Sequence, residues 1–238
     1  MGCMVMQKTL RLVGHQPEYL PWIGFFNKIC MGDRYMIVDN VQYRKKYFQN
    51  RNRIRTQNGW NWVQVPVLTK GKFDQPICEV RVDNSLPWRR KNWRSIEYAY
   101  GKSPYFSKYA DSFKEIYERE WEFLSDLNEN LVRLLFRHLE IGIPVCKASE
   151  LKVEGVKTEL ILNMCRAVGA VTYVSGKFGR DYLDLEMLRK AGIAVEFQEF
   201  IHPVYPQRFN PFIPEMSVID LLFNVGPKAK EVVRGGVL

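Results

Sequence analysis

Two polar side chains that can take part in acid–base chemistry each follow a short apolar segment within residues 10–56. His15 follows the mainly apolar residues 10–13 after one glycine, and Asp39 comes directly after residues 35–38. Ligands bind at the carboxyl ends of the strands in open α/β sheets. An imidazole can accept or donate a proton near neutral pH. We therefore predict that His15 and Asp39 are catalytic, with Asp39 orienting an acceptor amine or a ribose. A histidine that only caps the following turn is the alternative.

Cationic side chains follow the second of these apolar segments. Residues 43–55 contain Arg44, Lys45, Lys46, Arg51, Arg53 and Arg55, and they contain no acidic residue. In an extended segment Asn50 and Asn52 share one face, and Arg51 and Arg53 share the other. Guanidinium groups bind phosphates in a bidentate manner, which suits nucleotide diphosphates. We predict that Arg51 and Arg53, helped by Lys28, bind phosphate. A solvated charged loop is the alternative.

A second anion-binding loop is indicated after the apolar residues 171–174. Ser175, Gly176 and Lys177 open this loop, in which the glycine frees backbone amides to hold a phosphate or a carboxylate. The loop has the spacing of neither the P-loop nor the GxGxxG motif. Asp220, on the last expected helix, is either a site carboxylate or a local cap. The full predicted set of substrate-binding residues is Gln16, Tyr19, Trp22, Lys28, Gln42, Asn50, Arg51, Asn52, Arg53, Ser175, Gly176, Lys177, Asp181, Tyr182 and Asp220.

The composition is that of a soluble globular protein that binds anions. Of the 238 residues, 46% are hydrophobic and 26% are charged, and the formal net charge is +9. This charge favours nucleotides, sugar phosphates, nucleic acid or a membrane surface as partners. No segment approaches the roughly 18 consecutive apolar residues of a membrane span. Residues 1–8 do not form a secretory signal, and Gly2 fits a myristoylation pattern only in part, so we expect a cytoplasmic protein.

Cysteine and histidine usage argues against a metal centre. The five cysteines, Cys3, Cys30, Cys78, Cys146 and Cys165, are scattered singly, without a CxxC pair, and there are only three histidines. This pattern favours reduced thiols and predicts neither a structural zinc site nor a disulfide framework.

Strands alternate with helices along the chain. We expect strands at residues 10–13, 35–38, 60–67, 78–82, 171–174 and 194–200, and a hairpin turn at Asn58 and Gly59. We expect helices at residues 87–100, 105–139, 158–168, 185–190 and 218–224. This order predicts an α/β fold with a mixed, largely parallel sheet and flanking helices. The simplest organisation is a single domain, 1–238, with a helical insertion at about residues 84–144.

Several of these segments resemble the WbqC-like protein family. Residues 14–28, GHQPEYLPWIGFFNK, are similar to the family opening HQPxYLPWxGYFxK. Residues 39–42 and 49–54 are similar to its DDVQ and QNRNRI blocks, with Asn40 in place of a frequent second aspartate. Shorter similar pieces occur at residues 59–60, 65–67, 173–176, 181–183 and 217–221. The resemblance covers nearly the whole chain, and its first third is the most specific.

The resemblance implies a role in surface polysaccharide or O-antigen biosynthesis. The expected activity is transfer of an acyl or aminoacyl group, such as glycine, to a nucleotide-linked amino sugar, with ATP as cofactor if the acyl donor is activated in the same site. A strand followed by a histidine-containing turn and a helix is also similar to adenylate-forming nucleotidyltransferases, although their second histidine is missing here. A non-catalytic protein that binds a sugar nucleotide or nucleic acid is the alternative from another class. Nucleic acid is the less favoured ligand because no RRM, KH or helix-turn-helix signature occurs.

Overall fold

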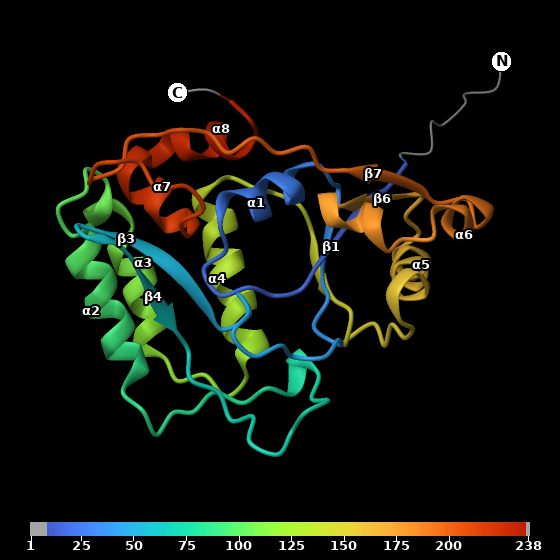
Figure 1. The fold of residues 1–238 in the computed structure, drawn as a ribbon, viewed down its shortest axis with the longest axis horizontal. Helices are drawn as coiled ribbons and strands as arrows, with labels where there is room; N and C mark the ends of the chain where they lie inside the picture. Colours follow the sequence, from blue (N-terminus) through green and yellow to red (C-terminus); the bar gives the residue numbers. More distant parts are fainter. Residues whose placement is uncertain (1–8, 237–238) are drawn as a thin grey trace.

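A five-stranded parallel sheet forms the centre of the protein (Figure 1). The computed structural model describes residues 9–236, so Gly2 and Cys3 lie outside the described residues. In spatial order the strands are β5 (Val145–Lys147), β2 (Arg34–Ile37), β1 (Arg11–His15), β6 (Thr172–Ser175) and β7 (Ala194–Phe197). All neighbouring pairs are parallel. The α/β class and the largely parallel sheet predicted from the sequence are confirmed.

The strand order reverses between β1 and β6. From β1 the chain adds β2 and then β5 on one side, and it then returns to add β6 and β7 on the other side of β1. The connections after β1 and β6 therefore leave the sheet in opposite directions, which opens a crevice at the carboxyl ends of these two strands.

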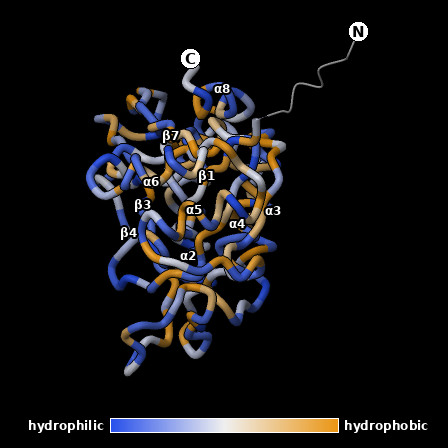
Figure 2. Tube along the Cα trace, turned by 90° about the vertical axis from the view of Figure 1, so that its right-hand side faces the viewer, coloured by the Kyte–Doolittle hydropathy of each residue, from blue (hydrophilic) through white to orange (hydrophobic). Residues whose placement is uncertain are grey.

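The two faces of the sheet pack against different sets of helices. Val13 and Ile37 join a large apolar cluster on the face covered by α1 (Ile23–Cys30) and α4 (Leu124–His138). Leu12 and Met36, their neighbours in the strands, face a smaller cluster formed with α5 (Lys157–Val168) and α6 (Leu185–Lys190). Buried strands of this kind are apolar on both faces because helices cover both sides. Apolar stretches run through the body of the fold, between polar loops at its edges (Figure 2).

A long segment between β2 and β5 builds the other half of the molecule. It contains the hairpin β3 (Arg51–Thr56) and β4 (Gly59–Gln64), then η1 (Ile77–Glu79), α2 (Trp88–Tyr100), α3 (Phe106–Glu118) and α4. The remaining elements are η2 (Lys177–Asp181), α7 (Val218–Val225), η3 (Gly226–Lys228) and α8 (Ala229–Val233). The predicted helical insertion and the turn at Asn58 and Gly59 are confirmed, with Gly59 at a φ of +122°. The description of residues 1–238 as one domain stays a prediction.

Some predicted elements are wrong. The expected strand 78–82 is a 3-10 turn followed by isolated bridges, because Cys78 N–H donates to Asp39 O and Val80 N–H donates to Ile77 O. The expected helix 105–139 is two helices, and the chain is extended at Arg119, with ψ of 150°. The buried Trp121 indole donates to the carbonyl of Ile116, so the chain turns to bury this ring between the helices.

Other differences lie at sheet edges. The strand β5 was not predicted because it is only three residues long and half-buried. The strand β7 ends at Phe197, three residues before the predicted end at Phe200. Edge strands of this length carry too few residues for a period-2 pattern to define their bounds.

Candidate functional site

A cleft of about 750 Å³ opens at the carboxyl ends of β1 and β6, where the strand order reverses. Its polar and cationic lining residues are His15, Gln16, Lys28, Gln42, Arg44, Lys157 and Ser175. Its apolar wall includes Leu160, Ile161 and Met164 from α5, and Tyr173 from β6. This is the place where open α/β sheets bind ligands, and three cationic side chains reach it from helix α1, from the loop before β3 and from helix α5.

His15 is the last residue of β1, and one ring nitrogen is free to accept a proton. The Nδ1 atom lies 2.9 Å from the carbonyl oxygen of Gln16, which can only accept, so Nδ1 carries the hydrogen. The Nε2 lone pair is therefore available. Burial, together with the nearby Lys28 ammonium, lowers the pKa of His15 to about 3. The ring is 27% exposed and packs edge-to-face on Phe25. His15 is thus neutral at pH 7, and its 3.9 Å contact with Glu18 is not an ion pair.

Lys28 brings a buried ammonium to the cleft from helix α1. Its Nζ donates to the carbonyl oxygen of Gly14 at 3.1 Å. Burial lowers the pKa of Lys28 to about 8, against the opposing effect of Glu18, so the amine is charged at pH 7. Burial raises the pKa of Glu18 to about 7, against the opposing effect of Lys28. The ammonium has three hydrogens and one protein acceptor among the described residues, so two remain for a ligand anion.

The loop after β6 packs tightly under the cleft because it contains Gly179. A Cβ atom added at Gly179 would lie 2.0 Å from Ser175 Oγ. Ser175 and Gly176 both line the cleft, as does Tyr182. Lys177 and Asp181 do not line it; Lys177 lies over the ring of Phe178.

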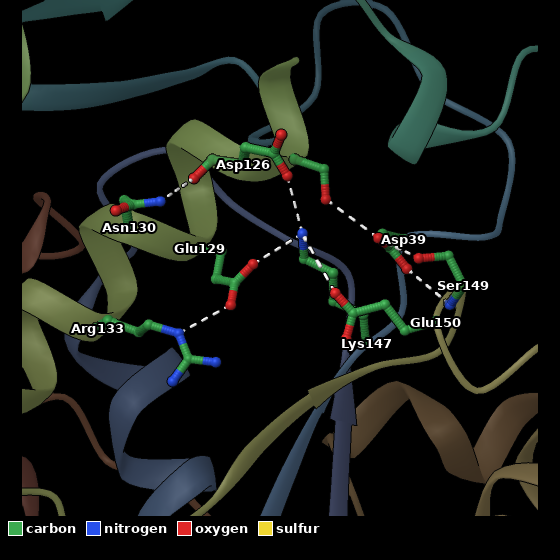
Figure 3. Close-up of polar contacts among 9 residues, drawn as sticks. Asp39, Asp126, Glu129, Asn130, Arg133, Lys147, Ser149 and Glu150 are labelled. Carbon is green, nitrogen blue, oxygen red and sulfur yellow. Dashed lines mark hydrogen bonds and ion pairs between the residues drawn. The ribbon is translucent and has the colours of Figure 1, made fainter. Parts of the chain in front are cut away.

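Asp39 is buried and joins three parts of the chain instead of lining the cleft (Figure 3). Its carboxylate accepts hydrogen bonds from Ser149 N–H at 3.1 Å, Ser149 Oγ at 2.8 Å and Ser125 Oγ at 3.2 Å. Beside this group, Lys147 pairs with Asp126 and Glu129 at 2.8 Å each. These bonds tie the end of β2 to β5 and α4. The structure therefore gives Asp39 a connecting role.

The asparagine and arginine residues around β3 lie outside the cleft. Asn50 donates to Val65 O, and Asn52 donates to the carbonyls of Tyr19 and Leu20, so both amides hold buried backbone. Arg51 lies 4.1 Å from the ring of Trp62, and Arg53 pairs with Glu215 at 2.9 Å. The predicted separation of the two asparagines from the two arginines onto opposite faces is observed.

Three other predicted site residues are packed elsewhere. The hydroxyl of Tyr19 is buried. It contacts the hydroxyl of Tyr117 and accepts a hydrogen bond from the side-chain amide of Asn92. Trp22 packs against Phe200 and His202. Asp220 is fully buried and accepts from Tyr205 and Gln207; burial raises its pKa to about 6, against these hydrogen bonds.

The structure adds cleft residues that the sequence did not indicate as a site. Arg44 and Tyr47 line the cleft from the basic segment 43–55, while the more prominent Arg51 and Arg53 do not. Lys157 lines it from the first residue of α5, more than 140 positions after His15. The charge of residues 43–55 was a signal for Arg44. No local signal marked Lys157, because only the return of the chain to β6 places it here.

Two features are absent from residues 9–236. In this range no helix combines the length and apolar character that crossing a bilayer requires. The same range contains no group of three or more histidine, cysteine or acidic side chains that could hold a metal ion.

The fold and its cleft define an α/β protein with an open cleft at the switch point of a parallel sheet. The chain matches the WbqC-like protein family over residues 16–232. It is also 35% identical over 221 residues to the uncharacterized protein Rv1507c of Mycobacterium tuberculosis, covering 92% of this chain and 95% of that protein. No solved structure matches it at a significant level. The chain belongs to the WbqC-like protein family.

Proposed function

We propose that this protein is an enzyme of surface polysaccharide biosynthesis that works in the cytoplasm. In this proposal it transfers an acyl or aminoacyl group, such as glycyl, to a nucleotide-linked amino sugar. The single observation that supports it most is the convergence of Lys28, Arg44 and Lys157 with His15 in one switch-point cleft. Cations attract the diphosphate of a sugar nucleotide, and the apolar wall from α5 accommodates the sugar or the base.

In the proposed reaction the amine of the sugar attacks the acyl carbonyl carbon. A C–N bond forms, the bond to the leaving group breaks, and Nε2 of His15 accepts the proton from the amine nitrogen. The low pKa of His15 makes it a weak base. A bound diphosphate counters the charge of Lys28 and raises that pKa, so the base strengthens when substrate is present.

The experiment is a product assay by mass spectrometry. The protein is incubated with a uridine diphosphate-linked amino sugar and an activated glycyl donor, and the product gains the mass of one glycyl group. We expect this product with the wild type and its loss with His15→Ala. An unchanged yield with His15→Ala would show that His15 does not act as proposed.

A nucleotidyl transfer reaction is the second candidate. The sheet order, with a histidine as the last residue of its central strand β1, favours this reaction because a nucleotide phosphate can lie against the end of such a strand. ATP would then be the cofactor, and release of pyrophosphate in the presence of the acyl acid would identify this reaction.

A binding protein without catalytic activity is the remaining alternative. Thermal shifts distinguish it, because ligands that bind the folded state raise the melting temperature. Sugar nucleotides or ATP should stabilise the proposed enzyme, and single-stranded oligonucleotides should not. Preferential stabilisation by oligonucleotides would favour a nucleic-acid-binding protein.

A further inference from the structure

A second cavity, of about 840 Å³, lies between the β3–β4 hairpin and helix α2. It shares no lining residue with the switch-point cleft. One wall is the exposed face of α2, with Arg90, Lys91 and Arg94. The other wall is the hairpin end, with Gln57, Asn58 and Asn61. We call this cavity the α2 groove.

The three cations of the α2 groove are not neutralised within the protein. Arg90, Lys91 and Arg94 are exposed, and none of their charged groups makes an ion pair or a hydrogen bond with any residue between 9 and 236. Their neighbour Arg89 differs, since it lies 3.9 Å from Glu120 and donates to the carbonyl of Glu118. No aspartate or glutamate lines the groove. The groove therefore carries three positive charges that no side chain among residues 9–236 pairs with.

The spacing of the groove residues matches a diphosphate attached to a ring. Arg90 and Arg94 are four residues apart on one helix, so their side chains leave the same face about 6 Å apart. Two guanidiniums at this separation can each bind one phosphate of a diphosphate. Tyr98, four residues further along, lines the same groove and is 83% exposed. From Arg90 to Tyr98 the stripe is about 12 Å long.

The opposite wall supplies groups that can bind the ring of such a ligand. The side-chain amides of Gln57, Asn58 and Asn61 both donate and accept hydrogen bonds. Within the described chain none of these three amides has a hydrogen-bond partner. Amides opposite an exposed aromatic ring can hydrogen-bond the edge of a base while its face stacks on Tyr98.

We propose that the α2 groove is a second binding site, which takes a nucleoside diphosphate. Arg90 and Arg94 bind the two phosphates, Lys91 adds charge, and Tyr98 stacks on the base. The site shares no lining residue with the switch-point cleft, so the two can bind ligands separately.

The test is calorimetric titration with ADP and with inorganic pyrophosphate. The Arg90→Ala/Arg94→Ala double variant should lose at least ~10-fold in affinity for both ligands, whereas Tyr98→Ala should weaken ADP and leave pyrophosphate unchanged. The matched control is Arg189→Ala/Lys190→Ala, which removes two exposed cations on α6 and should change neither affinity.

Two further arms separate this site from the cleft and from a polymer site. The variant His15→Ala/Lys28→Met, altered in the cleft, should bind ADP in the α2 groove with unchanged affinity. This result does not depend on whether the proposed acyl transfer takes place in the cleft. Equal losses of affinity in the groove variant and in the α6 control would overturn the proposal, because binding would then depend only on the net charge of the protein. Tighter binding of a single-stranded ten-nucleotide RNA than of ADP would also overturn it, in favour of a nucleic-acid surface.

Discussion

The ammonium of Lys28 lies 3.1 Å from the carbonyl oxygen of Gly14 and thereby fixes helix α1 to the end of strand β1. This contact places a buried positive charge beside His15 at the base of the cleft. The same charge that lowers the pKa of His15 is available to a ligand phosphate. Ligand binding and the proton affinity of His15 are therefore coupled.

Replacing His15 by alanine should remove catalysis and keep the fold. General acid–base groups contribute about 100- to 10,000-fold to rates, so we expect turnover to fall within this range. The ring is partly exposed and its Nδ1 contacts only the adjacent carbonyl, so the melting temperature should change little. Steady-state rates and a thermal melt measure the two effects. A variant that unfolds would instead point to a structural histidine.

The pKa of His15 should rise when a diphosphate ligand binds. In the free protein it lies near 3 because of burial and Lys28, well below the ordinary value of 6.5. A ligand anion beside Lys28 favours the imidazolium, which raises the pKa. Nuclear magnetic resonance of the imidazole nitrogens, with and without a uridine diphosphate-linked amino sugar, measures this change. An identical titration in both samples would mean that the anion does not bind next to His15.

Replacing Lys28 by methionine should stabilise the protein at neutral pH and weaken ligand binding. The folded-state pKa of Lys28 is about 8, below the unfolded value of 10.5, so folding disfavours its charged form. The unfolded state binds the extra proton between pH 8 and 10.5, and the unfolding free energy of the wild type therefore rises with pH in that window. Between pH 8 and pH 10.5 the unfolding free energy of the wild type should rise by ~3 kcal/mol relative to that of Lys28→Met. Urea denaturation of both proteins at pH 8 and pH 10.5 measures this change. The same difference in unfolding free energy between the two proteins at both pH values would contradict the prediction.

Replacing Asp39 by alanine should destabilise the fold without affecting the cleft. Three donor groups of Ser125 and Ser149 lose their acceptor at a buried site, which costs about 3 kcal/mol. Urea denaturation measures the loss, and titration with a sugar nucleotide at low temperature measures the affinity. The control Ser149→Ala removes one of these donors and should cost less. A loss of affinity with intact stability would instead support the predicted catalytic role of Asp39.

Features that depend on the order of residues along a short segment could be predicted from the sequence. Parallel strands bring their carboxyl ends to one edge, and the predicted places of His15 and Ser175 at strand ends agree with their common position in the cleft, at the ends of β1 and β6. The roles of Asp39 and Asn52 could not be predicted this way. Asp39 contacts Ser149, 110 residues away, and Asn52 holds the carbonyl of Leu20, 32 residues away. Partners at such separations are set by the packing of the insertion, which leaves no periodic signal in the sequence.

The most direct test of the central claim is amide hydrogen exchange with and without a uridine diphosphate-linked amino sugar. The claim is that the phosphate-bearing ligand binds in the switch-point cleft. We predict slower exchange at residues 14–16 and 175–179, and smaller changes there in Lys28→Met. Protection confined to the α2 groove or to the outer face of the β3–β4 hairpin, with no change at residues 14–16 and 175–179, would contradict it.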